Sequence, residues 1–177
     1  MRLPDPDNLR IVHYPDPVLK KVCAPVEEFG PELKALADKM LALMHEAEGA
    51  GLAGPQVGIP IRLFVCNPTG EPGNDLVCVN PRFIELTGGE EKEEGCLSIP
   101  GVSVTTRRAT QAVMEAWDTD GKPFRRTGCD LEARIWQHEA DHLEGRLLTD
   151  NMATTDEIAN RRAVRQLEAD YAATSRA

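Results

Sequence analysis

Apolar residues recur at every third or fourth position over residues 31–48, which is the spacing of side chains on one face of an α-helix. The positions that form this stripe are Leu33, Leu36, Ala37, Met40, Met44 and Ala47. Pro31 suits the first helical position, where its missing N–H has no intrahelical partner to lose. A second apolar stripe predicts another helix over residues 155–172. Its apolar positions are Val164, Leu167 and Tyr171.

Residues 61–126 contain short apolar runs separated by turn residues, a pattern that predicts β-strands. The predicted strands are 61–66, 76–80, 82–86, 102–106, 111–117 and 122–126. Residues 118–121 are expected to form the hairpin turn between the last two. We expect the acidic run 90–94 to be a solvated surface, and the proline-rich residues 1–30 to wrap the surface with a short strand over 8–13. Strands flanked by helices indicate an α+β fold with antiparallel sheets.

Length and composition indicate one folded domain. The chain has 177 residues, 41% of them hydrophobic, so we expect a single domain over residues 1–177 with a C-terminal helix and tail over 155–177. A net charge of −9 argues against broad binding to nucleic acids. The N-terminus has no apolar signal segment, and no stretch is long enough to cross a membrane. We therefore expect a cytoplasmic monomer that binds neither DNA nor a membrane.

The five cysteines are odd in number and include no CxxC pair, which predicts reduced thiols instead of a disulfide framework. Four of them are expected to be small core residues. These four are Cys23, Cys66, Cys78 and Cys129. Cys96 differs, because it lies between Gly95 and a Leu-Ser-Ile-Pro stretch, where an exposed turn could present a thiolate.

The strongest chemical signal is the nonapeptide 137–145, Gln-His-Glu-Ala-Asp-His-Leu-Glu-Gly, which holds two of the four histidines. Residues four apart on a helix lie on one face, so His138 and His142 can reach a single cation. In this HExxH arrangement two imidazoles usually bind a metal, and the intervening Glu139 takes a proton from a water that the metal activates. The alternative is a surface helix that carries two solvated histidines.

The helix that carries this motif has a predicted start and a predicted end. Asp130 can serve as its N-cap and Gly145 as its stop signal. Leu131 and Ile135 continue the face of the two histidines, one turn at a time. Both side chains could therefore line an apolar pocket beside the metal, and an unbranched side chain such as that of methionine would suit it well.

A catalytic metal site normally has three protein ligands and one open position, so the chain must supply a third ligand. Leu148 stands where the metzincin pattern has its third histidine. Glu157 and Glu168 lie downstream, but no motif supports them. The better candidate lies upstream, in the stretch Glu-Glu-Gly-Cys-Leu-Ser-Ile-Pro at residues 93–100.

Residues 49–58 formally contain the GxGxxG pattern of nucleotide-binding loops. A dinucleotide site needs this pattern after a strand and at the start of a helix, whereas here it follows a helix and contains Pro55. We therefore reject a nucleotide site. The stretch instead offers backbone free of side chains for close approach to a ligand, together with one amide donor, Gln56.

Together, three stretches of the chain resemble the motifs of the peptide deformylases. Residues 49–58 resemble the GxGLAAxQxG motif of that family, residues 94–98 its EGCLS motif and residues 137–145 its QHExDHLxG motif, in the same order. Three ordered motifs are a far more specific signal than one. The resemblance implies a metal-dependent hydrolase that removes the N-formyl group from the first methionine of newly synthesised proteins and releases formate. The implied fold is a buried HExxH helix surrounded by antiparallel sheets.

The resemblance also implies a role for each matching residue. The implied metal ligands are Cys96, His138 and His142. Glu139 is the implied general acid and base, Gln56 and the backbone N–H of Leu97 are the implied oxyanion donors, and Gly51 is the implied backbone contact to the substrate. One divalent ion is expected per chain. Ligand type alone favours Zn²⁺, whereas the family natively uses Fe²⁺ and tolerates Ni²⁺ or Co²⁺.

Two positions depart from the family pattern, and two other function classes remain as alternatives. Gly54 stands where members usually have alanine, and Ser103 stands where many have an arginine near the peptide backbone of the substrate.

The last helix carries three arginines opposite its apolar stripe, so it either packs simply on the domain or docks near the ribosomal exit. These arginines are Arg161, Arg162 and Arg165. The alternatives are a general HExxH metallopeptidase and a non-catalytic protein with a structural metal.

Overall fold

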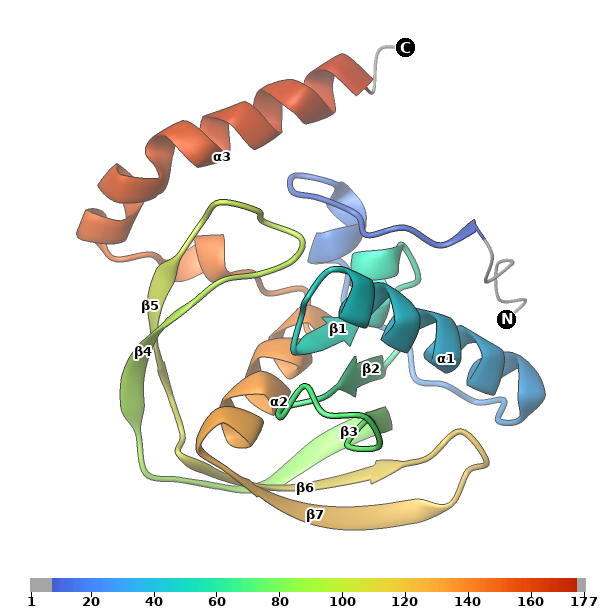
Figure 1. Cartoon of the computed structure of the whole chain (residues 1–177). Helices are drawn as coiled ribbons and strands as arrows, with labels where there is room; N and C mark the ends of the chain where they lie inside the picture. The colour runs from blue at the N-terminus through green and yellow to red at the C-terminus, as the bar shows by residue number, and fades with distance from the viewer. Residues whose placement is uncertain (1–7, 175–177) are drawn as a thin grey trace.

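The computed structural model describes residues 8–174, in which a central helix is surrounded by strands (Figure 1). The α-helices are α1 (Pro31–Glu46), α2 (Asp130–Leu143) and α3 (Thr154–Thr174). The strands are β1 (Gly51–Ala53), β2 (Leu63–Cys66), β3 (Leu76–Thr87), β4 (Glu90–Glu94), β5 (Val104–Arg108), β6 (Gln111–Trp117) and β7 (Pro123–Cys129). Short 3₁₀ helices are η2 (Pro17–Lys20), η3 (Gly54–Val57) and η4 (Leu148–Asn151). These elements confirm the predicted α+β class.

The strands form a five-stranded sheet in the order β1-β2-β3-β6-β7 and a separate pair of β4 and β5, all antiparallel. In Figure 1 the β4–β5 pair lies to the left of α2, and β6 and β7 lie below it. The two strands predicted over 76–80 and 82–86 are one strand, β3. Its register against β6 shifts between Val79 and Arg82, because Pro81 has no N–H to donate to the ladder.

Helix α2 buries apolar and polar side chains alike. Its buried residues are Ala133, Arg134, Ile135, Trp136, Gln137, Glu139, His142 and Leu143. A side chain on Gly128 of β7 would come within 2.7 Å of the Trp136 ring, so this glycine allows close packing of the strand on the helix. The predicted N-cap role of Asp130 is wrong. Strand β7 runs directly into the helix, so Cys129 is the N-cap and Asp130 is the first helical residue.

Helix α2 ends at Leu143, and Gly145 stops it, as the sequence predicts. Gly145 has a φ of 70°, in the left-handed region that favours glycine. Its N–H donates to the His142 carbonyl at 3.1 Å, and the Arg146 N–H donates to the Asp141 carbonyl at 2.9 Å. These two bonds complete a C-terminal cap of the Schellman type. The turn therefore fixes the end of the helix that presents His142.

Helix α1 packs its predicted apolar stripe against the larger sheet. The buried members are Leu33, Leu36, Ala37, Met40 and Met44, each at most 2% exposed. The helix ends at Glu46, two residues before the predicted end. Residues 8–13 form no strand, which corrects a further prediction. The Val12 N–H instead donates to the Gln56 carbonyl at 2.7 Å, so this segment runs along η3.

Helix α3 contacts the rest of the chain through a narrow stripe. Ala163, Val164 and Leu167 pack against a cluster of buried residues. That cluster comprises Leu19, Ile99, Val102, Val104 and Leu147. The predicted C-terminal helix is thus confirmed, with Asn160 as its buried residue. Among the described helices, none is long and apolar enough to span a membrane.

All five cysteines lie within the described residues, and all are free thiols. Cys23, Cys66 and Cys78 are buried, as predicted. Cys129 is exposed, because side chains alternate along β7 and Gly128 takes the inward-facing position. The predicted core position of Cys129 is therefore wrong. Cys96 is half-buried, in the turn that follows β4.

Candidate active site

Cys96, His138 and His142 meet between α2 and the turn that follows β4. Their ligand atoms all lie within 4.8 Å of one another, and Cys96 Sγ is 3.3 Å from His142 Nε2. The two histidines are one helical turn apart, with ring centroids separated by 5.0 Å. One thiolate and two imidazoles suit a borderline or soft divalent ion. The structure thus brings the three predicted ligands together as a site for a divalent metal.

A buried carboxylate orients one of the two histidines. Glu94 is 7% exposed and accepts a hydrogen bond from His138 Nδ1 at 3.0 Å. Arg134 and Arg108 donate to the same carboxylate at 2.6 and 3.0 Å. With Nδ1 occupied in this way, His138 presents Nε2 to the ligand cluster. The prediction that residues 90–94 form a solvated surface is therefore wrong for Glu94.

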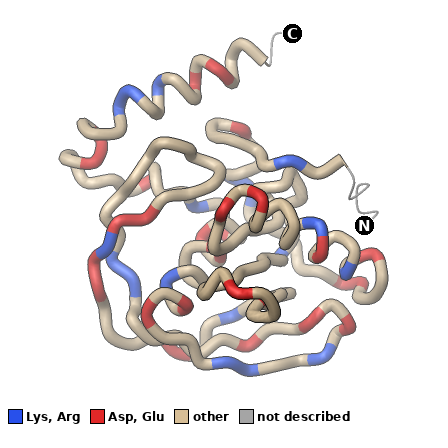
Figure 2. Tube along the Cα trace, in the orientation of Figure 1, with Lys and Arg blue, Asp and Glu red and all other residues tan. Residues whose placement is uncertain are grey.

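The position of Glu94 at the inner end of β4 explains this correction. Exposed acidic residues precede it, and Figure 2 shows the acidic β4 beside the basic end of β5, where Glu90 pairs with Arg108. Burial raises the pKa of Glu94, but hydrogen bonds from His138 and Arg108 outweigh this effect and lower the pKa to about 2. The sequence carried one usable signal, because Glu94 is the first residue of the EGCLS-like motif, two positions before Cys96.

The electrostatics of the ligand cluster favour a cation. Burial lowers the pKa of His138, but hydrogen bonds with Cys96 and Glu94, and the charge of Glu139, outweigh burial and raise it to about 10. Burial holds the pKa of His142 well below its usual range. The negative groups that raise the pKa of His138 would also attract a divalent cation to the cluster. The donor set and its electrostatics therefore both fit a divalent ion.

Glu139 has the properties of a group that transfers protons. It is 3% exposed, and its Oε2 has no hydrogen-bond partner among the described residues. Burial raises its pKa to about 7, with Glu94 adding to this effect and His138 opposing it. A carboxyl group with such a pKa can both accept and return a proton near neutral pH.

Gln56 and Leu97 supply hydrogen-bond donors beside the ligands. Gln56 is 1% exposed, and its Oε1 accepts from the Ala53 N–H at 2.7 Å. Its amide nitrogen therefore points at Cys96 Sγ, 3.5 Å away, and at Ser98 Oγ, 3.2 Å away. The Leu97 N–H finds no acceptor within the described part of the chain. Two donors near a metal site can stabilise an oxyanion.

Two glycines of the first motif leave room for functional side chains. A Cβ on Gly51 would lie 2.8 Å from the carboxyl carbon of Glu139, and one on Gly49 would lie 2.5 Å from Leu97 Cδ1. Real Cβ atoms do not approach other atoms so closely, so a larger residue at Gly51 would displace Glu139. Sequence reasoning proposed Gly51 as a substrate contact and missed its packing against Glu139.

A cavity of about 470 Å³ adjoins these groups. Its lining includes eight of the residues that the sequence predicts to be functional: Gly51, Gln56, Cys96, Leu97, Leu131, Ile135, His138 and Glu139. Ile135 is buried, whereas Leu131 is 53% exposed. His142, the remaining site residue, lines a smaller cavity that it shares with His138. A ligand in the larger cavity would therefore lie against two of the predicted metal ligands, the Glu139 carboxylate and the predicted hydrogen-bond donors.

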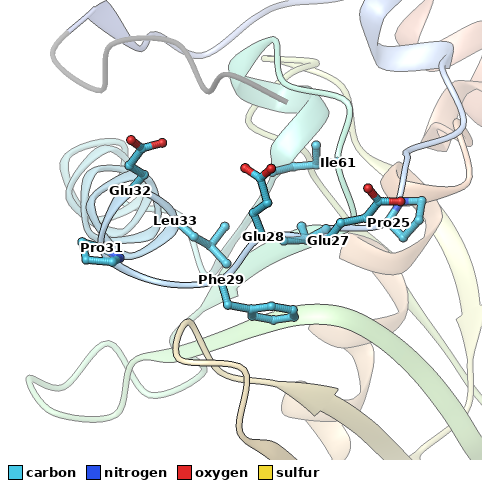
Figure 3. Close-up of a pocket in the computed structure, with 9 residues that line it drawn as sticks. Pro25, Glu27, Glu28, Phe29, Pro31, Glu32, Leu33 and Ile61 are labelled. Atoms are coloured by element: carbon cyan, nitrogen blue, oxygen red, sulfur yellow. The ribbon is translucent and has the colours of Figure 1, made fainter.

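A second cavity, of about 440 Å³, lies between α1 and the segment before it (Figure 3). Its lining includes the apolar side chains of Phe29 and Leu33 and the carboxylates of Glu27, Glu28 and Glu32. None of the three motifs contributes a residue to it. The motif-lined cavity is therefore the candidate active site.

Comparison with known proteins agrees with this geometry. The family model for polypeptide deformylase matches residues 8–157. A peptide deformylase of Acidobacterium capsulatum is 44% identical over 137 residues, covering 76% of this chain and 81% of that protein. A peptide deformylase of Rhodopirellula baltica is 39% identical over 146 residues, covering 81% of this chain and 73% of that protein.

Solved structures extend the similarity to the fold. Peptide deformylase 1B of Arabidopsis thaliana, in complex with an inhibitor, superposes with a TM-score of 0.89 at 37% identity, covering 95% of this chain and 94% of that chain. A peptide deformylase of Legionella pneumophila superposes with a TM-score of 0.85 at 39% identity, covering 92% of this chain and 96% of that chain. From the motifs, the fold and these relatives together, the chain belongs to the polypeptide deformylase family.

Proposed function

We propose how this chain carries out the activity of its family, which is hydrolytic removal of the formyl group from the N-terminal methionine of nascent peptides. In this proposal Cys96, His138 and His142 hold one divalent ion, and Glu139 moves the protons. The observation that carries the proposal is the convergence of three ligand atoms within 4.8 Å, in the site that also contains a buried carboxyl oxygen with no partner among residues 8–174. The convergence argues for a catalytic site, because three protein ligands leave a position open.

Each protein group has a defined task in this mechanism. A divalent ion, when bound, polarises the formyl carbonyl and brings the pKa of the attacking water toward about 7. Glu139 takes a proton from that water and later delivers it to the leaving amine, and a pKa of about 7 suits both transfers. Gln56 and the Leu97 N–H donate hydrogen bonds to the developing oxyanion, each worth on the order of 3 kcal/mol.

Specificity follows from the enclosure of the reacting carbonyl. A formyl group presents only a hydrogen on the far side of its carbonyl, so a site bounded by Gly51 and Leu97 admits it and excludes larger acyl groups. Leu131 and Ile135 would contact the side chain of the first residue, and the flexible methionine side chain suits such an apolar surface. Formyl-Met should therefore be preferred over acetyl-Met by at least about a hundredfold in kcat/KM.

Fe²⁺ is the metal that we propose. The thiolate and two imidazoles would also accept Zn²⁺, Ni²⁺ or Co²⁺, so the choice rests on resemblance to the family, which natively uses ferrous iron. Elemental analysis of protein purified without oxygen tests this choice. Iron at about one atom per chain is expected, and zinc alone would contradict it.

A ribosomal partner is the second part of the proposal. Arg161, Arg162 and Arg165 line a shallow hollow on α3, and basic segments are visible along that helix in Figure 2. Such a face could meet RNA phosphates at the ribosomal exit, where new formylated chains emerge. Co-sedimentation of ribosomes with wild type, but not with a variant that has alanine at all three positions, would support docking. Equal co-sedimentation would end this part of the proposal.

We also propose that residues 1–177 act as one domain and that the protein is a monomer. We propose a cytoplasmic location, because new formylated chains are made in that compartment in bacteria. Sedimentation equilibrium and cell fractionation test these points.

The activity assay is release of formate from a formyl-methionyl peptide by metal-loaded protein, with the acetylated peptide as comparison. Cleavage of internal bonds in unformylated peptides would favour the metallopeptidase alternative. A metal-loaded protein that acts on neither substrate would favour a structural metal.

A further inference from the structure

One wall of the substrate cavity is a segment without regular secondary structure. It spans residues 95–103, between β4 and β5. The members that line the cavity are Gly95, Cys96, Leu97, Ile99, Gly101 and Val102. The wall thus carries both the proposed thiolate ligand and a proposed oxyanion donor. Because it lacks a strand or helix of its own, its position depends on contacts from other elements.

Asn160 of α3 holds the end of this wall. Its Oδ1 accepts from the Ser103 N–H at 3.2 Å, and its Nδ2 donates to the Ser103 carbonyl at 2.7 Å. The same Nδ2 donates to the Asp156 carbonyl at 2.9 Å, which fixes the side chain on its helix. Asn160 is 7% exposed. Its amide therefore makes the pair of bonds that a neighbouring strand would make to Ser103.

A second contact lies two residues further along the same edge, at Thr105. Asp156 Oδ2 accepts from the Thr105 N–H at 3.0 Å. Among the described strands, β5 pairs only with β4, so its other edge is available to these two side chains. Two side chains of α3 thus hydrogen-bond to the backbone at the start of β5.

Apolar contacts support the wall from the same side. A Cβ on Gly101 would lie 3.9 Å from the Cβ of Ala163, and Val164 and Leu167 pack on the cluster that contains Ile99 and Val102. Figure 1 shows α3 lying over the connection between β4 and β5. The helix that follows all three motifs is therefore packed against the back of the active-site wall.

We propose that Asn160 is a positioning residue for deformylation, because it holds Ser103 and thereby sets where residues 95–103 meet the substrate peptide. This inference rests on the proposed assignment of Cys96 and Leu97. Ser103 does not line the cavity itself, but it directly follows Gly101 and Val102, which do. A small displacement of its backbone would therefore move these lining residues and weaken binding of the peptide.

The test compares full-length, metal-loaded Asn160→Ala with wild type on formyl-Met-Ala-Ser. KM should rise about three- to tenfold, with kcat within about twofold of wild type and metal content unchanged. Hydrogen exchange at the Ser103 amide should accelerate. Gln166→Ala is the matched control, because the Gln166 amide bonds only Asp170 on the exposed side of the same helix, and it should leave every value unchanged.

The alternatives give different results. An unchanged KM in folded, metal-loaded Asn160→Ala overturns the proposal. A loss confined to metal content, kcat and melting temperature also overturns it, because it indicates general structural support. If wild type and Gln166→Ala release no formate, the assigned function has failed instead. If Asn160→Ala does not fold, Asp156→Ala at a half-exposed position tests the same edge, and it should raise KM by a smaller factor or the proposal is wrong.

Discussion

Helices α2 and α3 differ in how they use buried polar side chains. Of the 14 residues of α2, eight are buried, and four of these are polar or charged. Of the 21 residues of α3, only Asn160 is buried. Helix α2 crosses the interior between the two sheets, whereas α3 touches the domain along one stripe. Their roles follow from this difference.

Within α2 the buried polar side chains fall into two groups. Arg134 and Gln137 bond to protein partners, Glu94 and the backbone of Ala109 among them. Glu139 and His142 each retain one buried polar atom without a partner among the described residues. Trp136 Nε1 is a third such atom on α2 among the described residues. A buried polar atom without a partner costs about 1–3 kcal/mol, so the two that lie at the candidate site, on Glu139 and His142, call for a function. In α3, by contrast, the buried amide of Asn160 has partners for both of its polar atoms.

The largest effect should come from the unpaired carboxylate. Glu139→Gln keeps the size of the side chain but removes the proton acceptor, so kcat/KM should fall by about a thousandfold or more. The metal should remain at about one ion per chain, because Glu139 is not a proposed ligand. Formate release and elemental analysis on the same sample check both points. A rate near that of wild type would remove Glu139 from the mechanism.

A smaller loss should follow from displacing the same carboxylate. In Gly51→Ala, the new methyl group would overlap the Glu139 side chain and push its carboxylate out of its present position. A misplacement of about 1 Å costs about a hundredfold in turnover. Metal content should be unchanged. Steady-state kinetics at saturating metal measure the loss, and normal turnover would show that the carboxylate is not held where the structure has it.

Loss of Glu94, the carboxylate that bonds His138, should reduce metal affinity instead of slowing the chemical step. Glu94→Ala removes the acceptor for His138 and leaves Arg134 and Arg108 without their buried partner. Metal affinity should fall about 10- to 100-fold, and unfolding should become easier by about 3 kcal/mol. Competition with a chelator and urea unfolding give the two values. Glu91→Ala, at an exposed position of the same strand, is the control and should change neither.

The smallest effect belongs to the exposed face of α3. Replacing Arg161, Arg162 and Arg165 by alanine should leave turnover of a free peptide within about twofold, since the face contacts no part of the active site. Any loss of ribosome binding in this variant would be independent of its turnover of the free peptide. A large loss of turnover on the free peptide would mean that α3 acts on the site through more than its buried stripe.

The same contrast explains what the sequence could predict. The apolar stripe of α1 follows directly from helical periodicity, and its buried members are among those predicted. In α3, Val164 and Leu167 pack on the domain as predicted, whereas the buried Asn160 was not predicted. Periodicity could not reveal the buried position of Glu94, because acidic neighbours made it resemble a surface run, and its partners Arg108 and Arg134 are distant in sequence.

Close packing was also beyond the sequence. The sequence shows only that Gly54 stands where family members usually have alanine, whereas in the structure a Cβ there would lie 2.6 Å from the Ile59 carbonyl oxygen, so this loop has no room for alanine. The three motifs, in contrast, named six residues that line the cavity, namely Gly51, Gln56, Cys96, Leu97, His138 and Glu139. The sequence could predict chemistry that depends on residue type and spacing. It could not predict geometry that depends on contacts between residues distant in the chain.

The central claim is that Cys96 joins His138 and His142 as a ligand of a catalytic metal. The most direct test is the metal content of Cys96→Ala, with Cys129→Ala as a matched control because that cysteine is exposed and outside the site. Elemental analysis should find about one divalent ion per chain in wild type and in Cys129→Ala, and little or none in Cys96→Ala. Full occupancy in Cys96→Ala would contradict the account.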